Sequence, residues 1–258
     1  MSTGGVIGKL VEGLAAGRVL SAWVGLNEAA IAETLAREDF DAVTLDMQHG
    51  GLDLVGCARA ISAIALAGKP AVARVPVGDF ATASRLADAG AAAIIAPMIN
   101  SAEDARRFAS FVKFPPVGDR SWGPRAALTL SGLAPGDYFK LANRFTLALA
   151  MIETAEALAA AEDILDVDGI DGVFIGPADL SIGLSNGANV DPHGAPVTAA
   201  IQEVVKAAES RGKFVGLWCV DGARAAYALS LGVRFATVSS DQMLLRAAAK
   251  AELKAARG

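Results

Sequence analysis

Residues 145–158, FTLALAMIETAEAL, contain the pattern that decides the fold. The segment begins as an apolar run without a period, which is typical of a strand buried on both faces of a parallel sheet. Glu153 follows this run directly, and a helix-forming stretch, TAEALAAAEDILD, comes next. An ionised carboxylate removed from water must be paired or must hold a metal ion. Because strand–helix repeats build their active sites at the carboxyl ends of the strands, we interpret Glu153 as a metal ligand.

The same alternation of strand and helix extends along the chain. Further strands are predicted within residues 19–26, 40–46, 70–77, 91–99, 169–184, 214–221 and 235–241. Strands that alternate with helices form a parallel sheet, and eight such units close into a (β/α)₈ barrel of the TIM type. We therefore predict the α/β class and a single barrel domain over residues 1–258.

The helical segments carry start signals. Residues 4–16 have apolar positions at helical spacing, and we expect a short helix that closes one end of the barrel. Asn27 is the expected N-cap of the next helix, and Ser101 that of a later one. Residues 115–144 read as a long loop with one weak helix near residues 137–142. At this length a loop is expected to be a functional lid or a contact between subunits.

Composition excludes several classes of partner. The longest apolar run, residues 91–99, is too short to span a bilayer, and Lys9 and Glu12 interrupt any secretory apolar segment. With 23 basic against 28 acidic residues and no basic cluster, we expect neither nucleic acid nor a membrane as a partner. Cys57 and Cys219 form no disulfide framework and no paired ligand motif. A cytoplasmic location is expected.

Polar residues, most of them ionisable, gather at the predicted carboxyl ends of four strands. These residues are Asp46, Gln48 and His49 after the second strand, Arg74 after the third, Glu153 after the fifth and Asp179 after the sixth. Parallel strands of a barrel end at one mouth, so we expect these side chains to converge there.

Each residue also has a structural interpretation. Glu153 could be a solvated acid at a helix start, and Asp179 could cap a turn. Arg74 could pair with a barrel acid instead of binding a substrate anion. His49 could be a loop or core residue, although a histidine beside an acid at a strand end can act in acid–base catalysis. His193 lies in a turn-rich loop and is read as structural.

The two carboxylates together favour a hard divalent cation. Two acidic ligands, with water or substrate oxygens in the other positions, are typical of magnesium sites, and no histidine pair or thiolate indicates structural zinc. Lys69 and Lys213 precede strands and no lysine ends one, so a Schiff-base mechanism lacks its nucleophile. No glycine-rich phosphate cradle follows the last two strands.

The chain resembles the HpcH/HpaI family of metal-dependent pyruvate aldolases over nearly its whole length. The matching segments are LDMQHG, VARVP, RLADAGAAAIIAPMI, AMIETAEAL and GVFIGPADLS. The last two, in that order on adjacent strands, are the most specific part of the resemblance.

The resemblance implies a class II aldolase. In such an enzyme Glu153 and Asp179 hold magnesium, manganese or cobalt, and pyruvate chelates the ion as it forms the enolate. Arg74 binds the enolate oxygen, and His49 acts in acid–base steps. The family pairs this histidine with an aspartate that matches Asp88, which the residues alone would have left as an ordinary helix-end acid.

The resemblance also implies a substrate site. Backbone amides around Gly176, Pro177, Ala178 and Asp179 would hold the substrate carboxylate. Trp218, near the end of the seventh strand, is expected to line the site.

The chain departs from the family at three positions. Many members have glutamate where Gln48 stands, some have glutamine where Met151 stands, and Trp218 is bulky where smaller residues are common. These changes bear on the acceptor aldehyde. Family members are commonly trimers of dimers with exchanged terminal helices, a role that the amphipathic tail at residues 243–256 could serve.

We therefore predict a lyase that cleaves or forms 4-hydroxy-2-oxo acids from pyruvate or hydroxypyruvate and an aldehyde. One alternative is a lyase for CoA thioesters of the same superfamily, which would need a basic nucleotide site; Arg120 and Arg125 are weak candidates for it. The other alternative is a barrel that binds an oxo acid without catalysis, although binding alone needs neither His49 nor Arg74.

Overall fold

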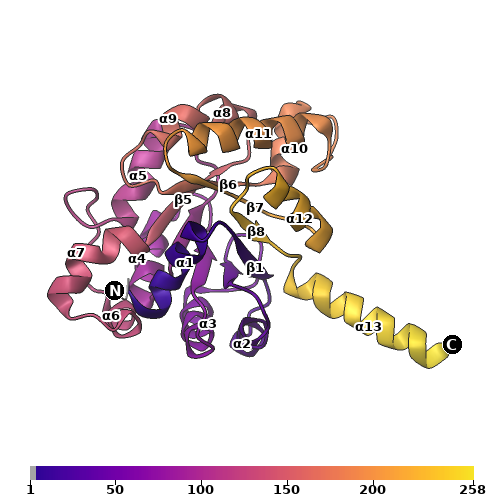
Figure 1. The fold of residues 1–258 in the computed structure, drawn as a ribbon, viewed down its shortest axis with the longest axis horizontal. Helices are drawn as coiled ribbons and strands as arrows, with labels where there is room; N and C mark the ends of the chain where they lie inside the picture. The colour runs from indigo at the N-terminus through magenta and orange to yellow at the C-terminus, as the bar shows by residue number, and fades with distance from the viewer. Residues whose placement is uncertain (1–3) are drawn as a thin grey trace.

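The structure is a computed structural model that describes residues 4–258. Eight parallel strands pair in the order of the sequence and close into a barrel (Figure 1). The strands are β1 (Val19–Val24), β2 (Ala42–Asp46), β3 (Ala71–Arg74), β4 (Ala93–Ala96), β5 (Leu147–Ile152), β6 (Gly172–Ile175), β7 (Phe214–Leu217) and β8 (Phe235–Thr237). The predicted (β/α)₈ barrel is confirmed.

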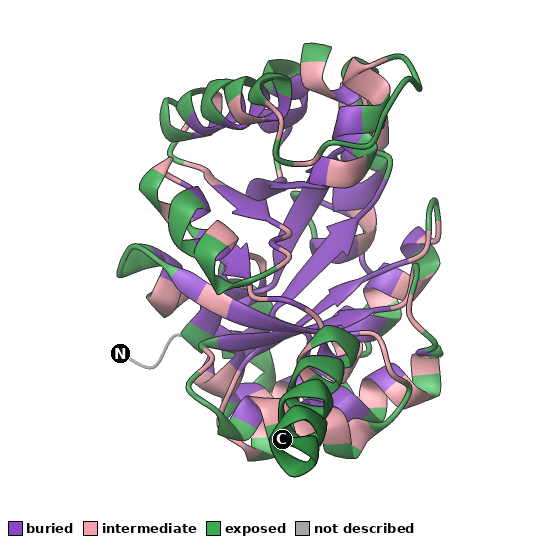
Figure 2. Ribbon diagram, turned by 90° about the vertical axis from the view of Figure 1, so that its right-hand side faces the viewer, coloured by how far each residue is buried: buried purple, intermediate pink, exposed green. Residues whose placement is uncertain are grey.

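Helices surround the barrel and cover the outer face of the strands. They are α1 (Gly5–Ala15), α2 (Ala29–Arg37), α3 (Leu54–Leu66), α4 (Phe80–Ala89), α5 (Ala102–Val112), α6 (Arg125–Ser131), α7 (Pro135–Phe145), α8 (Ala155–Ala159), α9 (Ala161–Leu165), α10 (Pro177–Leu184), α11 (Ala195–Glu209), α12 (Gly222–Ser230) and α13 (Asp241–Arg257). The strands are almost wholly buried, and the outward faces of the helices are exposed (Figure 2).

The strands contribute to two apolar cores. Outward-pointing residues pack against the helices, and inward-pointing residues, among them Trp23, Phe174 and Phe235, fill the barrel. Gly216 is required inside the barrel, because an added Cβ would lie 2.5 Å from the Phe174 ring and 3.1 Å from the Phe235 ring. The interior of the barrel is therefore a packed core of side chains.

The predicted N-terminal helix is confirmed as α1. Its buried residues Ile7, Leu10 and Leu14 join the inner core with Val19 and Leu147, which are the first residues of β1 and β5. The helix therefore closes the amino-terminal end of the barrel and leaves the opposite end free.

The weak helix expected near residues 137–142 is confirmed as part of α7, but the rest of residues 115–144 is not one long loop. This segment contains two helices, α6 and α7, and both pack with α1 near the amino-terminal end of the barrel. A seven-residue helix such as α6 has little stability of its own and depends on tertiary packing, which the sequence pattern does not report. Within this chain the segment is not a lid over the strand ends.

Two predicted N-caps have different outcomes. Ser101 caps α5, since its side chain accepts a hydrogen bond from the amide of Asp104. Asn27 does not cap α2; the N-cap is Glu28, whose side chain accepts from the amide of Ala30. The helix thus starts one residue later than its cap signal predicts.

The C-terminal helix α13 extends away from the barrel (Figure 1). Most of its residues are exposed, including Met243, Leu245 and Leu253. No helix within residues 4–258 is both long and apolar enough to cross a membrane.

A buried ion pair fixes the start of β5, the strand that leads to Glu153. Lys113 is 1% exposed, and its ammonium group donates to the carbonyl groups of Asn143 and Thr146 at 2.9 and 2.7 Å. The same group lies 2.6 Å from the carboxylate of Asp171, which accepts from the Ala148 amide at 2.7 Å. One cation therefore holds the end of α7 and the first turn into β5.

Replacing Lys113 with methionine should lower the urea concentration at the midpoint of unfolding. The substitution leaves the Asp171 carboxylate without its cation, and removing one partner of a buried pair costs about 3–5 kcal/mol. Adding Asp171→Asn should restore part of the loss, because the lone charge is then removed as well. Urea unfolding at neutral pH measures both variants. A wild-type midpoint for Lys113→Met would contradict the assigned role.

Candidate active site

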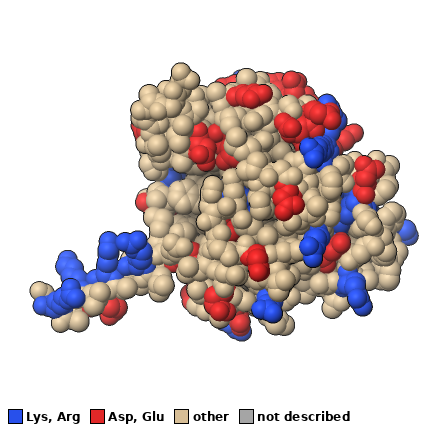
Figure 3. Space-filling model, turned by 180° about the vertical axis from the view of Figure 1, so that it is seen from behind, with Lys and Arg blue, Asp and Glu red and all other residues tan. Residues whose placement is uncertain are grey.

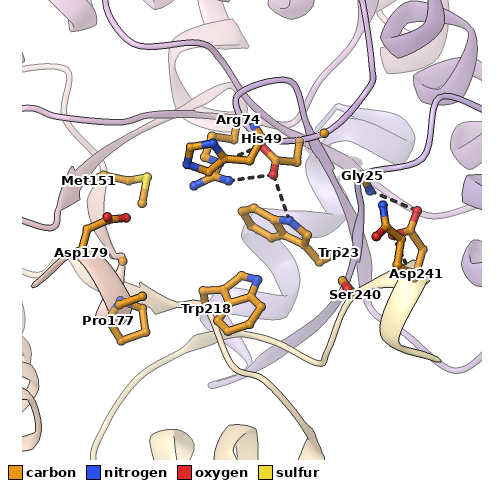
Figure 4. A pocket seen from close by; sticks show the side chains of 15 residues that line it. Trp23, Gly25, His49, Arg74, Met151, Pro177, Asp179, Trp218, Ser240 and Asp241 are labelled. Carbon is orange, nitrogen blue, oxygen red and sulfur yellow. Dashed lines mark hydrogen bonds and ion pairs between the residues drawn. The ribbon is translucent and has the colours of Figure 1, made fainter. Parts of the chain in front are cut away.

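A cavity of about 320 Å³ opens at the carboxyl ends of the strands (Figure 4). Its lining includes His49, Arg74, Trp218 and the segment 176–179, all of them predicted site residues. The structure thus brings together groups that follow β2, β3, β6 and β7, as expected of the open end of a barrel.

Arg74 is held in a rigid position by Asp46. Strands β2 and β3 pair with Asp46 opposite Arg74, and both residues end their strands. The Asp46 carboxylate accepts from Nε at 2.9 Å and from Nη2 at 2.7 Å of Arg74, which is 8% exposed. This bidentate pair is the interaction with a barrel acid that the sequence left open, and it does not use the Nη1 donor of Arg74.

Trp23, at the end of β1, supports the same pair. The Arg74 guanidinium lies 4.8 Å from the centre of the indole ring, and the indole N–H donates to the Asp46 carboxylate at 3.3 Å. A cation over an indole face is stabilised by the ring quadrupole. The guanidinium therefore has little freedom to rotate.

Glu153 lies at the first position after β5 and is 2% exposed. One carboxylate oxygen accepts from the Met98 amide at 2.8 Å, and the other, Oε2, is buried without a partner among the described residues. Burial raises the pKa of Glu153; the Met98 amide lowers it, the charge of Asp179 raises it and Arg74 lowers it. A buried, half-satisfied carboxylate next to a second one fits a cation better than a solvated helix-end acid.

Asp179 lies in the first turn of α10, and the start of this helix faces the cavity. The N-cap is Gly176, which has no side chain to accept from the first amides. An added Cβ at Gly176 would lie 2.6 Å from Oε2 of Glu153, so the position must stay a glycine. Pro177 has no N–H, which leaves the amides of Ala178 and Asp179 as donors for an anion.

These residues meet the requirements of a divalent cation only in part. Within residues 4–258 no three histidine, cysteine or acidic side chains are arranged as a ligand set. Glu153 and Asp179 supply two oxygen ligands, and the unpartnered Oε2 of Glu153 is the donor that would bind first. Such a pair is sufficient for magnesium, which retains water or substrate oxygens in its other positions.

His49 lines the cavity, and its side chain is exposed there. Its backbone amide donates to Asp46 at 3.3 Å, so the turn after β2 is tied to the Asp46–Arg74 pair. Figure 4 shows the imidazole close to Arg74 on the same side of the cavity.

Asp88 is not close to His49 within this chain. It lies near the end of α4, which returns to the amino end of β4, and its carboxylate accepts from Nη2 of Arg120 at 2.6 Å. It does not line the cavity.

The structure adds wall residues that the sequence did not single out. Trp23, Ser240, Asp241 and Gln242 all line the cavity. Trp23 lies in the middle of the strand predicted at residues 19–26, and its apolar neighbours favoured a core role. The other three begin the last helix, where cap residues and site residues look alike in sequence.

Comparisons with known proteins identify the family of the chain. The model of the HpcH/HpaI aldolase/citrate lyase family matches residues 20–248. A hydroxypyruvate/pyruvate aldolase of Rhizorhabdus wittichii is 42% identical over 238 residues, which cover 92% of this chain and 94% of the relative. A 4-hydroxy-2-oxo-heptane-1,7-dioate aldolase of Klebsiella pneumoniae is 36% identical over 241 residues, 93% of this chain and 90% of the relative.

A solved structure shares the whole fold. The HpcH/HpaI aldolase of Desulfitobacterium hafniense DCB-2 superposes with a TM-score of 0.87 at 26% identity, and the match covers 96% of each chain. The barrel fold, the cavity at its strand ends and the named relatives together define a carbon–carbon lyase of the aldolase class. The chain belongs to the HpcH/HpaI aldolase/citrate lyase family.

In metal-free protein, Glu153→Gln should raise the free energy of unfolding at about pH 8. The pKa of Glu153 is higher in the folded than in the unfolded chain, so ionising it costs stability. This cost is present at high pH and absent well below the ordinary value of 4.5, so the gain should vanish on acidification. Glutamine keeps an acceptor for the Met98 amide and carries no charge. Thermal unfolding in EDTA at both pH values measures the effect.

Glu156→Gln is the matched control, because Glu156 is exposed in the first turn of α8. It should give no gain at high pH. Added magnesium or manganese should stabilise the wild type but not Glu153→Gln. Equal destabilisation of Glu153→Gln at both pH values would contradict the assignment of Glu153 as a strained, buried charge.

Proposed function

We propose that this aldolase cleaves and forms 4-hydroxy-2-oxo acids at the cavity lined by Asp179 and Arg74, with pyruvate or hydroxypyruvate as the oxo acid. The observation that carries the proposal is the buried, unpartnered oxygen of Glu153 beside Asp179 and the uncapped start of α10. These groups suit an oxo acid, which presents a carboxylate and a neighbouring keto oxygen.

Enzymes of this family depend on a divalent metal ion. Glu153 and Asp179 would hold it here, and magnesium, manganese and cobalt all suit two carboxylate oxygens. The ion, when bound, supplies a Lewis acid for the keto group of the oxo acid. Binding would also provide the missing partner for Oε2 of Glu153.

The start of α10 would orient the oxo acid. The amides of Ala178 and Asp179 point from a helix N-terminus, where the positive end of the helix dipole favours an anion. They are suited to the carboxylate of pyruvate. A bound carboxylate also satisfies amides that the chain itself leaves unpaired.

Arg74 would stabilise the negative charge that develops on the substrate, and His49 would transfer a proton. In the synthetic direction the methyl carbon of pyruvate loses a proton and forms a bond to the aldehyde carbon, and the aldehyde oxygen gains a proton. Cleavage is the reverse. Arg74 is positioned to donate from Nη1 to the oxygen that becomes negative, and His49 to accept or return a proton.

The pairing of His49 with Asp88 stays a prediction. Within one chain Asp88 lies near the end of α4, accepts from Arg120 and does not line the cavity. A pairing with His49 would therefore have to come from a second copy of the chain.

A trimer of dimers with exchanged terminal helices stays a prediction as well. The support for it is α13, which projects from the barrel with Leu245 and Leu253 exposed (Figure 1). Lys and Arg side chains also cluster on the free part of this helix (Figure 3). The cytoplasmic location expected from composition is a further prediction.

Two alternatives are weaker. A CoA thioester would need free cations, but Arg120 is buried, bonded to Asp88 and placed 4.5 Å from the centre of the Phe114 ring. A barrel that only binds an oxo acid would not require an arginine locked by a bidentate carboxylate and an indole face. Exchange of the methyl protons of pyruvate in deuterated water separates catalysis from binding.

Removing divalent metal should abolish both aldol cleavage and exchange of the pyruvate methyl protons. Magnesium, manganese or cobalt should restore them in the wild type. Asp179→Asn should lose metal-induced thermal stabilisation together with activity, because one of the two ligands loses its charge. Full turnover in excess EDTA would contradict the metal assignment.

Arg74→Lys should lower kcat by at least ~100-fold, comparable to the loss of an oxyanion donor. Lysine keeps the charge but loses the planar fork that Asp46 fixes. KM for the oxo acid should rise much less, because the start of α10 still binds the carboxylate. Steady-state kinetics measure both constants. A large rise in KM at unchanged kcat would mean that Arg74 only binds the substrate.

A further inference from the structure

The cavity has two distinct ends. Figure 4 shows Asp179 and Met151 at one end, Gly25, Ser240 and Asp241 at the other, and the indole rings of Trp23 and Trp218 between them. If the oxo acid occupies the end beside Asp179, the aldehyde reaches toward the end formed by β1, β8 and α13. We call this second region, lined by Gly25, Ser240, Asp241 and Gln242, the acceptor end.

Two helices begin at the cavity, and their first turns differ. The start of α10 has no side-chain cap. The start of α13, in contrast, is capped by a side chain of the same chain. Ser240 Oγ accepts a hydrogen bond from the Met243 amide at 3.4 Å. The Asp241 carboxylate accepts from the amides of Gly25, Leu26 and Gln242 at 3.1, 2.8 and 2.8 Å. The anion position at α13 is therefore already occupied by Asp241.

The charged side chains that line the cavity also differ between its two ends. Among the described residues that line the cavity, Arg74 is the cation, and Asp46 already binds it through two hydrogen bonds. At the acceptor end the charged side chain is Asp241, which is 4% exposed. An aldehyde with a second carboxylate would approach a like charge in a confined space, which is unfavourable.

The neutral groups at the acceptor end suit hydroxyl groups. Ser240 offers a hydroxyl and Gln242 an amide that can both donate and accept. Trp23 and Trp218 offer flat apolar faces, and an indole N–H can donate to a ligand oxygen. A short hydroxylated aldehyde can use all of these groups, whereas a carboxylate finds no unpaired cation there.

We propose that the acceptor of this enzyme is a small, neutral, hydroxylated aldehyde and not an aldehyde that carries a carboxylate. The proposal rests on the function proposed above, because it assigns the oxo acid to the end beside Asp179. It makes Gln242 a residue that determines acceptor specificity, while the oxo-acid half of the reaction is independent of it.

The holoenzyme is tested with pyruvate and two aldehydes, glyceraldehyde and succinic semialdehyde. We expect kcat/KM for glyceraldehyde to exceed that for succinic semialdehyde by at least about tenfold, because the acceptor end repels a carboxylate. A preference for succinic semialdehyde in the wild type would overturn the proposal.

Two variants of Gln242 control for the different intrinsic reactivity of the aldehydes. Gln242→Lys adds a cation and should shift the ratio of the two kcat/KM values toward succinic semialdehyde by about fivefold, the upper worth of an exposed ion pair. The shift should shrink as salt is added. Gln242→Met has a similar length without charge, and it should lower kcat/KM for glyceraldehyde without raising that for succinic semialdehyde. An unchanged ratio in Gln242→Lys would overturn the assigned place of the acceptor.

Exchange of the pyruvate methyl protons, measured without aldehyde, separates this proposal from the function on which it rests. Both variants should exchange at the wild-type rate. Normal exchange with a preference for succinic semialdehyde would overturn the acceptor assignment alone. Absent exchange in the metal-loaded wild type would overturn the proposed function, and the acceptor assignment with it.

Discussion

The burial of one carboxylate, that of Glu153, is the constraint on which the site depends. The strand that leads to it is apolar at every position, and the residue is 2% exposed with one oxygen bonded to the Met98 amide. An unpaired charge in such a place is unfavourable unless something compensates for it. The fold thus holds this carboxylate out of water with one oxygen unpartnered among the described residues, an arrangement that a bound cation would stabilise.

At the same end of the barrel, the charge of Arg74 is neutralised by Asp46. Arg74 and Asp46 face each other across neighbouring strands, and Trp23 contacts both. A buried pair of this kind adds little net stability, because desolvation offsets much of the attraction. Its value here is geometric: the guanidinium is fixed through two of its nitrogens, so a third can face the cavity without a loss of side-chain freedom during the reaction.

The sequence predicted the barrel and most of the mouth because both follow from position along strands. Glu153, Asp179 and Arg74 each end an apolar run, and all parallel strands end on one side. Contacts between side chains could not be predicted in this way. The helix α6 depends on packing against α1 and α4, and the engagement of Asp88 by Arg120 depends on where the segment between α5 and α6 passes. Neither leaves a periodic signal in the chain.

Gly176 connects the two halves of the proposed oxo-acid site. Any side chain at this position would collide with Oε2 of Glu153, so the residue before α10 has to be glycine. Glycine cannot cap a helix through a side chain, and Pro177 then occupies the first helical position without an amide of its own. The burial of Glu153 therefore also leaves the start of α10 open to an anion. At α13 the steric demand is absent, Ser240 and Asp241 cap the helix, and the anion position is filled. One buried carboxylate thus accounts both for the place proposed for the cation and for the helix proposed to receive the substrate carboxylate.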